Sequence, residues 1–133
     1  MSANLDLVRS IYAAWERGDF SSAEWADPEI EVVLVDGPSP QHWKGLAGMA
    51  EGWREFLSAW ADYRVEADEY RELDDERVLV LISQSGRGKA SGLELHQMCS
   101  EAAALFHIQD GKAKRFVRYF DRERALADLG LEE

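Results

Sequence analysis

The fold of this protein follows from one stretch of its sequence, residues 93–121, which reads LELHQMCSEAAALFHIQDGKAKRFVRYFD. Two runs of strand-forming residues, 93–108 and 113–120, flank the dipeptide Asp110-Gly111. An Asp-Gly pair between two such runs is typical of the tight turn in an antiparallel hairpin. The stretch therefore predicts two long antiparallel strands at the centre of a sheet.

Side chains alternate between the two faces of a strand, which assigns each residue of this hairpin to a face. We expect one face to carry Cys99, Glu101, Ala103 and Leu105, with Phe116, Arg118 and Phe120 opposite them. The other face would carry Met98, Ser100, Ala102, Ala104 and Phe106, with Val117 and Tyr119. Because both faces are mostly apolar, we expect both to be covered. Glu101 and Arg118 then stand out as an acid and a base at the wall of a cavity.

The composition limits the class of protein. A length of 133 residues, 46% of them hydrophobic, predicts a single globular domain over residues 1–133. The 26 acidic residues outnumber the 15 basic ones, and a net charge of −11 argues against nucleic acids and anionic membranes as partners. One cysteine, no leader-peptide pattern and no long apolar run together predict a reducing, cytoplasmic location.

The remaining sequence predicts helices first and strands afterwards. Amphipathic helices are expected at residues 4–17 and 46–60, with a shorter one between Gly18-Asp19 and Asp27-Pro28. Strands are expected at residues 29–35, 62–73 and 77–82, the last continuing to residue 88. Residues 36–45 predict a loop, and residues 122–129 a final helix capped by Asp121. This order predicts an α+β fold in which helices close a curved sheet into a cone.

Several segments in this order resemble the SnoaL-like group of the nuclear transport factor 2-like, or ketosteroid isomerase-like, superfamily. They are residues 12–20 (YAAWERGDF), 26–31 (ADPEIE), 43–45 (WKG) and 110–112 (DGK), continuing through 118–121 (RYFD). The resemblance implies a cone-shaped α+β barrel, with N-terminal helices packed on a strongly curved, mostly antiparallel sheet. It also implies a small-molecule pocket, although this fold carries many unrelated activities.

Known catalytic groups of the superfamily do not transfer to this sequence. The positions of the aspartate base, the tyrosine and the protonated aspartate of ketosteroid isomerase correspond here to Val33, Ile11 and Ala103. Steroid isomerisation by that mechanism is therefore not expected. The epoxide hydrolases of the superfamily use two acids around an arginine, and Glu101 with Arg118 matches that set only in part.

Two interpretations of Glu101 and Arg118 remain open. In one, Glu101 is a general base and Arg118 orients it or stabilises an anionic intermediate. In the other, which we favour, they form a structural ion pair. The predicted ligand-binding residues are Tyr12, Trp15, Trp53, Phe56, Tyr63, Cys99, Phe116 and Phe120.

No metal or cofactor is expected. His96 and His107 are about 35 Å apart along one strand at ~3.4 Å per residue, too far to share a metal. The sequence also lacks a glycine-rich phosphate loop and a zinc signature.

The sequence supports two hypotheses of function. The first is a protein with a pocket for a small apolar carbonyl-containing or cyclic molecule, acting as an isomerase, cyclase, other lyase or hydrolase. The second is a non-catalytic ligand-binding or dimerisation module. In either case we expect a homodimer through an outer sheet face that carries Met98, Ala102, Ala104, Phe106 and Val117.

Overall fold

The computed structural model describes residues 3–19, 24–35, 41–88, 97–119 and 121–131, without the side chains of residues 41, 56, 59–62, 87, 88 and 97–100. The described helices are α1 (Ala3–Glu16), α2 (Gly45–Ala59) and α3 (Arg122–Asp128). The described strands are β1 (Ala26–Leu34), β2 (Gln41–Lys44), β3 (Trp60–Glu72), β4 (Arg77–Gly88), β5 (Gln97–Gln109) and β6 (Lys112–Tyr119). The predicted α+β fold class is confirmed.

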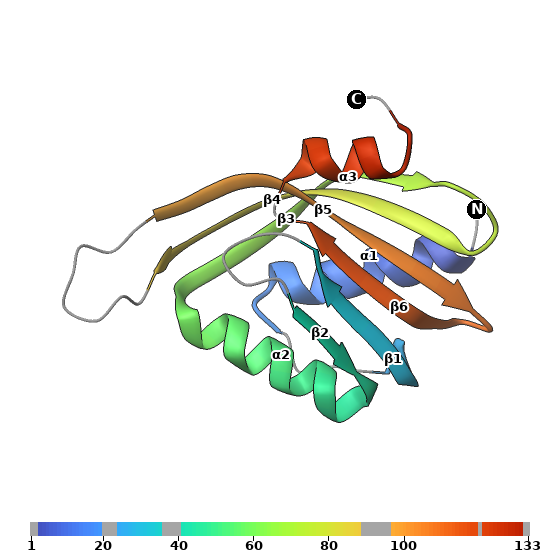
Figure 1. Ribbon diagram of the computed structural model, residues 1–133, viewed down its shortest axis with the longest axis horizontal. Coiled ribbons are helices and arrows are strands. Elements are labelled where there is room, and N and C mark those ends of the chain that lie inside the picture. Colours follow the sequence, from blue (N-terminus) through green and yellow to red (C-terminus); the bar gives the residue numbers. More distant parts are fainter. Residues whose placement is uncertain (1–2, 20–23, 36–40, 89–96, 120, 132–133) are drawn as a thin grey trace.

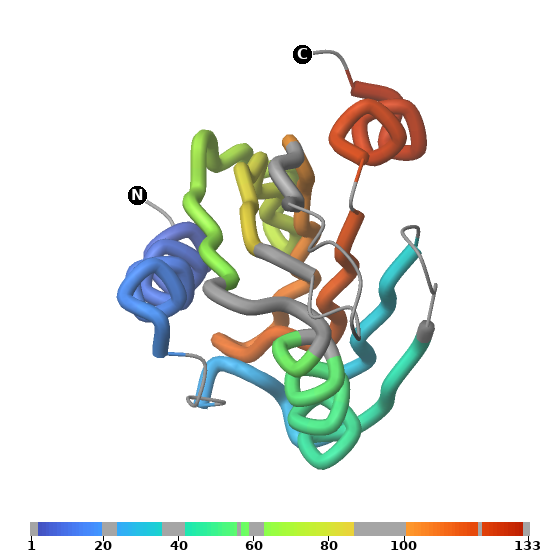
Figure 2. Tube along the Cα trace, turned by 90° about the vertical axis from the view of Figure 1, so that its left-hand side faces the viewer, coloured from blue at the N-terminus to red at the C-terminus, as the bar shows by residue number. Residues whose placement is uncertain are grey.

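The strands form one curled, open sheet in the order β2-β1-β6-β5-β4-β3 (Figure 1). The pairing of β1 with β6 is parallel, and the other neighbours are antiparallel. Helices α1 and α2 lie on one side of the strands and α3 lies on the other (Figure 2). We call the α1 and α2 side the inner face and the α3 side the outer face.

The predicted hairpin between β5 and β6 is present, with a change of register close to its turn. Asp110 and Gly111 have φ angles of 52° and 75°, as a tight two-residue hairpin turn requires. Ile108 then pairs with Ala113, whereas His107 pairs with Arg115. Lys114 is therefore the extra residue of a β-bulge.

This bulge makes our assignment of hairpin faces wrong. A one-residue shift of register exchanges the faces of one strand relative to the other. Beyond the bulge Phe106 pairs with Phe116, and Ala104 pairs with Arg118. Glu101 consequently lies on the outer face, while Arg118 lies on the inner face.

Both faces of the sheet are covered by apolar side chains, as expected. The inner cluster includes Tyr12 and Trp15 of α1, Met49 of α2, and Phe106 and Phe116 of the hairpin. The outer cluster joins strand residues to α3, and its buried members are Leu79, Leu81, Ala103, Leu105, Val117, Tyr119, Ala125 and Leu126. The expected outer-face set was therefore wrong for Ala102, Ala104 and Phe106, which belong to the inner cluster.

Three local predictions have different outcomes. The Asp121 carboxylate accepts a hydrogen bond from the Glu123 amide at 3.0 Å, which confirms it as the cap of α3. The predicted loop at residues 36–45 is wrong at its end, where residues 41–44 form β2. The predicted short helix falls largely on residues 20–23, outside the described part, and Trp25 lies in a turn rather than in that helix.

Candidate ligand-binding site

Arg118 is the centre of a polar cluster on the inner face. Its Nη2 atom donates to the Tyr63 hydroxyl oxygen at 3.1 Å and lies 3.5 Å from Oε1 of Gln84. The Tyr63 hydroxyl donates to the same Gln84 oxygen at 2.9 Å. The cluster therefore joins β6, β4 and β3, although β5 lies between β6 and β4.

Small side chains on β5 make this reach possible. Ala104 pairs with Arg118, and Ala102 is the next residue of β5 on the same face. Each presents only a methyl group to the interior, so the arginine side chain can extend over β5 without a steric clash.

Gln84 is the polar member that our sequence analysis missed. Its exposed fraction is 3%, the lowest among the polar and charged residues in the described part of the chain. Val78, Val80 and Ile82 precede it at intervals of two on the inner face of β4. The alternation of β4 therefore contained the signal, because it places Gln84 on the same face as these residues.

Aromatic rings form the surroundings of the guanidinium. The Arg118 Cζ atom lies 5.0 Å from the centre of the Trp53 ring and 6.0 Å from that of Phe116. Such distances allow cation–π attraction, which is stronger where water is excluded. Trp15 packs against both rings, with centroid distances of 5.0 Å to Trp53 and 5.7 Å to Phe116.

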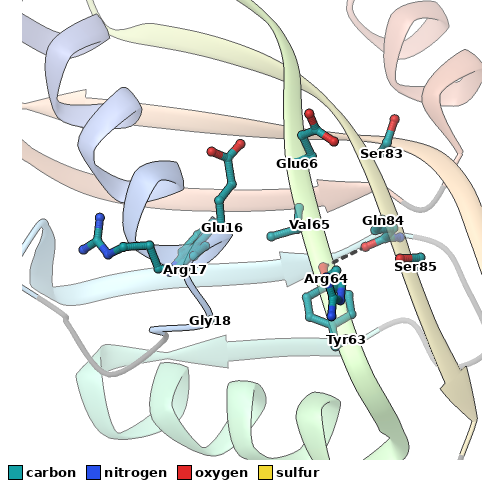
Figure 3. A pocket seen from close by; sticks show the side chains of 11 residues that line it. Glu16, Arg17, Gly18, Tyr63, Arg64, Val65, Glu66, Ser83, Gln84 and Ser85 are labelled. Carbon is teal, nitrogen blue, oxygen red and sulfur yellow. Dashed lines mark hydrogen bonds between the residues drawn. The ribbon is translucent and has the colours of Figure 1, made fainter.

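A cavity of about 730 Å³ reaches this cluster from the side of β3 (Figure 3). It is bounded by residues 15–18 at the end of α1, 63–66 of β3 and 83–85 of β4. Tyr63 and Gln84 belong both to this wall and to the Arg118 cluster. The cavity is within the usual size range of small-molecule sites, roughly 300–1,000 Å³.

A second, deeper hollow of about 20 Å³ lies on the other side of Arg118. Its other lining residues are apolar side chains and one glycine: Val32, Leu34, Trp43, Met49, Gly52, Trp53 and Phe116. It is only large enough for about one water molecule. The polar cluster thus stands between an open cavity and a small apolar hollow.

Burial makes Tyr12 and Tyr63 of the inner cluster harder to ionise than an ordinary tyrosine. It raises the pKa of Tyr63, against the opposing effect of Arg118. It also raises the pKa of Tyr12, which is 1% exposed. The inner face therefore presents a guanidinium, the kind of group that binds a carbonyl or an anionic oxygen, with the neutral Tyr63 phenol hydrogen-bonded beside it.

The predicted partnership of Glu101 and Arg118 is wrong. The Glu101 side chain is 74% exposed on the outer face, where its Oε2 atom lies 2.9 Å from Nη1 of Arg122. Arg122 also contacts Asp68 at 2.8 Å. Glu101 therefore forms its ion pair with Arg122 instead of Arg118, and it cannot act as a base on the inner face.

The structure brings together several of the predicted ligand-binding residues. Trp15 and Tyr63 line the open cavity, and Trp53 and Phe116 line the deeper hollow. Tyr12 instead packs inside the aromatic core, 4.8 Å from Trp15 between ring centres. Phe120 and the side chains of Phe56 and Cys99 lie outside the described residues.

A family model described as a SnoaL-like domain matches residues 8–116. No curated protein has significant similarity to the chain. In the described part of the chain, the structure has no helix with both the length and the apolar character needed to cross a membrane.

Similar folds occur in solved structures that share little sequence with this chain. An NTF2-like protein of unknown function from Burkholderia pseudomallei has a TM-score of 0.78 and 22% identity, covering 96% of this chain and 97% of its own. TerC, co-crystallised with polyporic acid, has a TM-score of 0.74 and 22% identity, and the match covers 96% of this chain and 98% of TerC. A protein with a ketosteroid isomerase-like fold from Catenulispora acidiphila, in complex with trimethylamine, has a TM-score of 0.71 and 13% identity. The match covers 96% of this chain and 94% of that protein.

Proposed function

The chain belongs to the SnoaL-like domain family, and from that premise we propose that its interior binds a small apolar or cyclic molecule through a carbonyl or ionised oxygen. The observation that carries this proposal is the placement of Arg118 on the inner face, hydrogen-bonded to Tyr63 beside the open cavity. A ligand oxygen at this position would accept charge-assisted hydrogen bonds, which are stronger than those between neutral groups.

The aromatic walls favour a ligand with a flat apolar part. Trp15 borders the open cavity, and Trp53 and Phe116 border the hollow beyond Arg118. Rings of this kind bury large apolar areas and stack or meet edge to face with other rings. Two proteins of similar fold are named with small ligands, polyporic acid and trimethylamine, which agrees with a small-molecule site.

The cluster is suited to polarising a carbonyl rather than to removing a proton. Arg118 could stabilise negative charge that develops on a carbonyl oxygen, while Tyr63 accepts from Arg118, donates to Gln84 and so holds the guanidinium in place. None of the described residues that line the deeper hollow is a carboxylate or an imidazole. The base of an isomerase, cyclase or hydrolase reaction would have to come from the wall of the open cavity, which includes Glu16 and Glu66. A non-catalytic binding module is the second candidate function.

Binding of an aromatic carboxylate tests the proposal. We expect naphthalene-2-carboxylate to bind more tightly than 2-methylnaphthalene in calorimetric titrations, because only the acid can pair with Arg118. Arg118→Met should weaken carboxylate binding by about 10- to 100-fold and leave the hydrocarbon unaffected. Arg124→Met is the control, since the Arg124 side chain is 51% exposed on α3. Equal binding of both compounds, or no effect of Arg118→Met, would contradict the proposed role.

We also propose that the chain forms a homodimer through its outer face. Partly buried apolar residues surround the outer cluster: Val33, Val35, Leu73, Leu129 and Leu131. Native mass spectrometry tests this by comparing the native mass with that of the denatured chain. A monomer at micromolar concentration would exclude a stable dimer, whereas an additional small mass would identify a bound ligand. The cytoplasmic location stays a prediction.

A further inference from the structure

We propose that Trp43 is the wall that sets the size of ring accepted beside Arg118. The inference rests on the proposed function, because it concerns the apolar part of a ligand whose oxygen lies at Arg118. The hollow on the far side of Arg118 is about 20 Å³, too small for an aromatic ring. A ring can enter it only if one of its walls moves.

Trp43 closes this hollow from β2. In the sheet, Trp43 pairs with Val32 of β1, and Val32 pairs in turn with Phe116 of β6. All three line the hollow, so the indole lies in one cross-strand row with Phe116, two residues before Arg118 on β6. The exchange of Trp43 for a smaller side chain would extend the space on the inner face.

Two glycines on one face of α2 provide the surface on which the indole lies. A Cβ atom at Gly52 would be 2.9 Å from Cδ2 and 3.0 Å from Cε2 of Trp43, closer than real Cβ contacts. At Gly48, one turn earlier, the nearest atom would be Cβ of Trp43 at 3.4 Å. Gly52 therefore allows the ring to lie directly against the helix backbone, and any side chain there would displace it.

Trp43 is also the part of this wall that can move at the lowest cost. It belongs to a strand of four residues, Gln41–Lys44, at the edge of the sheet and paired on one side only, with β1. The other walls belong to longer elements, the interior strands β1 and β6 and the helix α2. Movement of an edge strand breaks few backbone hydrogen bonds.

The arrangement points to a planar, oxygen-bearing ligand whose ring lies between Arg118 and Trp43. Its oxygen would accept from the guanidinium, and its ring would replace the indole near Phe116. The size of the ring would then be limited by the position of Trp43, while the oxygen would be recognised by Arg118 whatever the ring.

The test compares benzoate with naphthalene-2-carboxylate in calorimetric titrations, for the wild-type protein and for Trp43→Ala and Trp43→Phe. The ratio of the two affinities should rise in favour of the larger ring by at least about tenfold in Trp43→Ala, and by less in Trp43→Phe. An unchanged ratio in both variants would overturn it.

Failure of this inference is distinguishable from failure of the proposed function. If Arg118→Met weakens both carboxylates and the Trp43 variants leave their ratio unchanged, Arg118 binds the ligand but Trp43 does not select its size. If no variant binds either compound, both proposals fall.

A second pair of variants tests the position of the indole without removing it. Gly52→Ala should shift the Trp43 signal in fluorine NMR of protein labelled with fluorotryptophan, and should change the affinity ratio. Gly48→Ala is the matched control and should leave both nearly unchanged. A Trp43 signal that moves neither in Gly52→Ala nor on saturation with naphthalene-2-carboxylate would overturn the inference, even if Trp43→Ala did not fold.

Discussion

Arg118 of β6 donates a hydrogen bond to the Tyr63 hydroxyl of β3 across two intervening strands, with the two atoms 3.1 Å apart. On β5, Ala104 pairs directly with Arg118, and its side chain is only a methyl group. A longer side chain at position 104 would occupy the path of the arginine. The contact between Arg118 and Tyr63 therefore depends on the small side chain at position 104.

Ala104→Leu is expected to displace Arg118 and to weaken binding of aromatic carboxylates. Overpacking a full core position should also lower the free energy of unfolding by about 1–3 kcal/mol, measured by urea denaturation. Ala103→Leu is the matched control, since Ala103 is equally buried but faces the opposite side of the sheet. We expect a similar loss of stability in the control with binding retained. Equal binding by both variants would mean that Arg118 does not need this path.

An exchange at Arg122 should lower stability more than an exchange at Glu101, and neither should change the binding of aromatic carboxylates. The Arg122 side chain is 12% exposed, pairs with Asp68 and Glu101, and donates to the Ile82 carbonyl oxygen at 2.8 Å. Arg122→Gln should therefore lower the free energy of unfolding by about 1–3 kcal/mol, because the partly buried Ile82 carbonyl oxygen and two carboxylates lose their donor. Glu101→Gln should cost less than about 1 kcal/mol, since that carboxylate is mostly in water.

Urea denaturation of both variants measures these differences, and titration with naphthalene-2-carboxylate measures binding. If Glu101→Gln weakened binding as much as Arg118→Met, Glu101 would belong to the binding site after all. Equal destabilisation by the two outer-face exchanges would contradict the assigned importance of Arg122.

The sequence predicted the location of every described strand except β2, but it did not predict the face on which each hairpin residue lies. Apolar content, the Asp110-Gly111 turn and the helical periodicities are local properties, and the structure confirms the predicted helices α1, α2 and α3 and the predicted hairpin. The register of β5 against β6 depends on the single extra residue Lys114. Nothing in the run AKRFVRYF distinguishes a bulge from a regular strand, so the alternation was extended through it and Glu101 was placed inside.

Part of the candidate site could nevertheless have been predicted. Arg118 and Phe116 were assigned correctly to the inner face together, because the bulge precedes both residues on β6. Gln84 follows the alternation of Val80 and Ile82 and could have been placed with them. The contact of Trp43 with Gly52 joins β2 to α2, and no periodicity within either segment contains that information.

Alkaline pH should destabilise the protein in part through Tyr12. Burial raises the pKa of Tyr12 above its usual 10.0. Above about pH 10 the unfolded chain loses this proton while the folded chain retains it, so stability falls as pH rises. Tyr12→Phe removes that loss. The difference in free energy of unfolding between the variant and the wild type should therefore shift by about 1.4 kcal/mol in favour of the variant from pH 8 to pH 11, as measured by urea denaturation. Tyr70→Phe is the control and should gain less, because Tyr70 is only partly buried.

Mild acid should act on the outer face through His107. Burial lowers the pKa of His107 from its usual 6.5, and Arg115 of β6 and Arg77 of β4 lower it further. Asp74 and Glu76, in the turn before β4, have the opposite effect and raise the pKa of His107. Below about pH 6.5 the unfolded chain binds the proton more readily than the folded chain, so stability should fall as pH decreases.

Arg115→Gln is expected to raise the pKa of His107 toward its usual value without fully restoring it, because burial is the largest cause and remains. Proton NMR titration of the imidazole, assigned with His107→Gln, measures the pKa in each variant. Arg124→Gln provides the control, since Arg124 lies on α3 and does not contribute to the His107 shift. The decline in stability between pH 7 and pH 5 should become shallower in Arg115→Gln. A pKa of His107 equal to that of the wild type would show that Arg115 does not contribute to its depression.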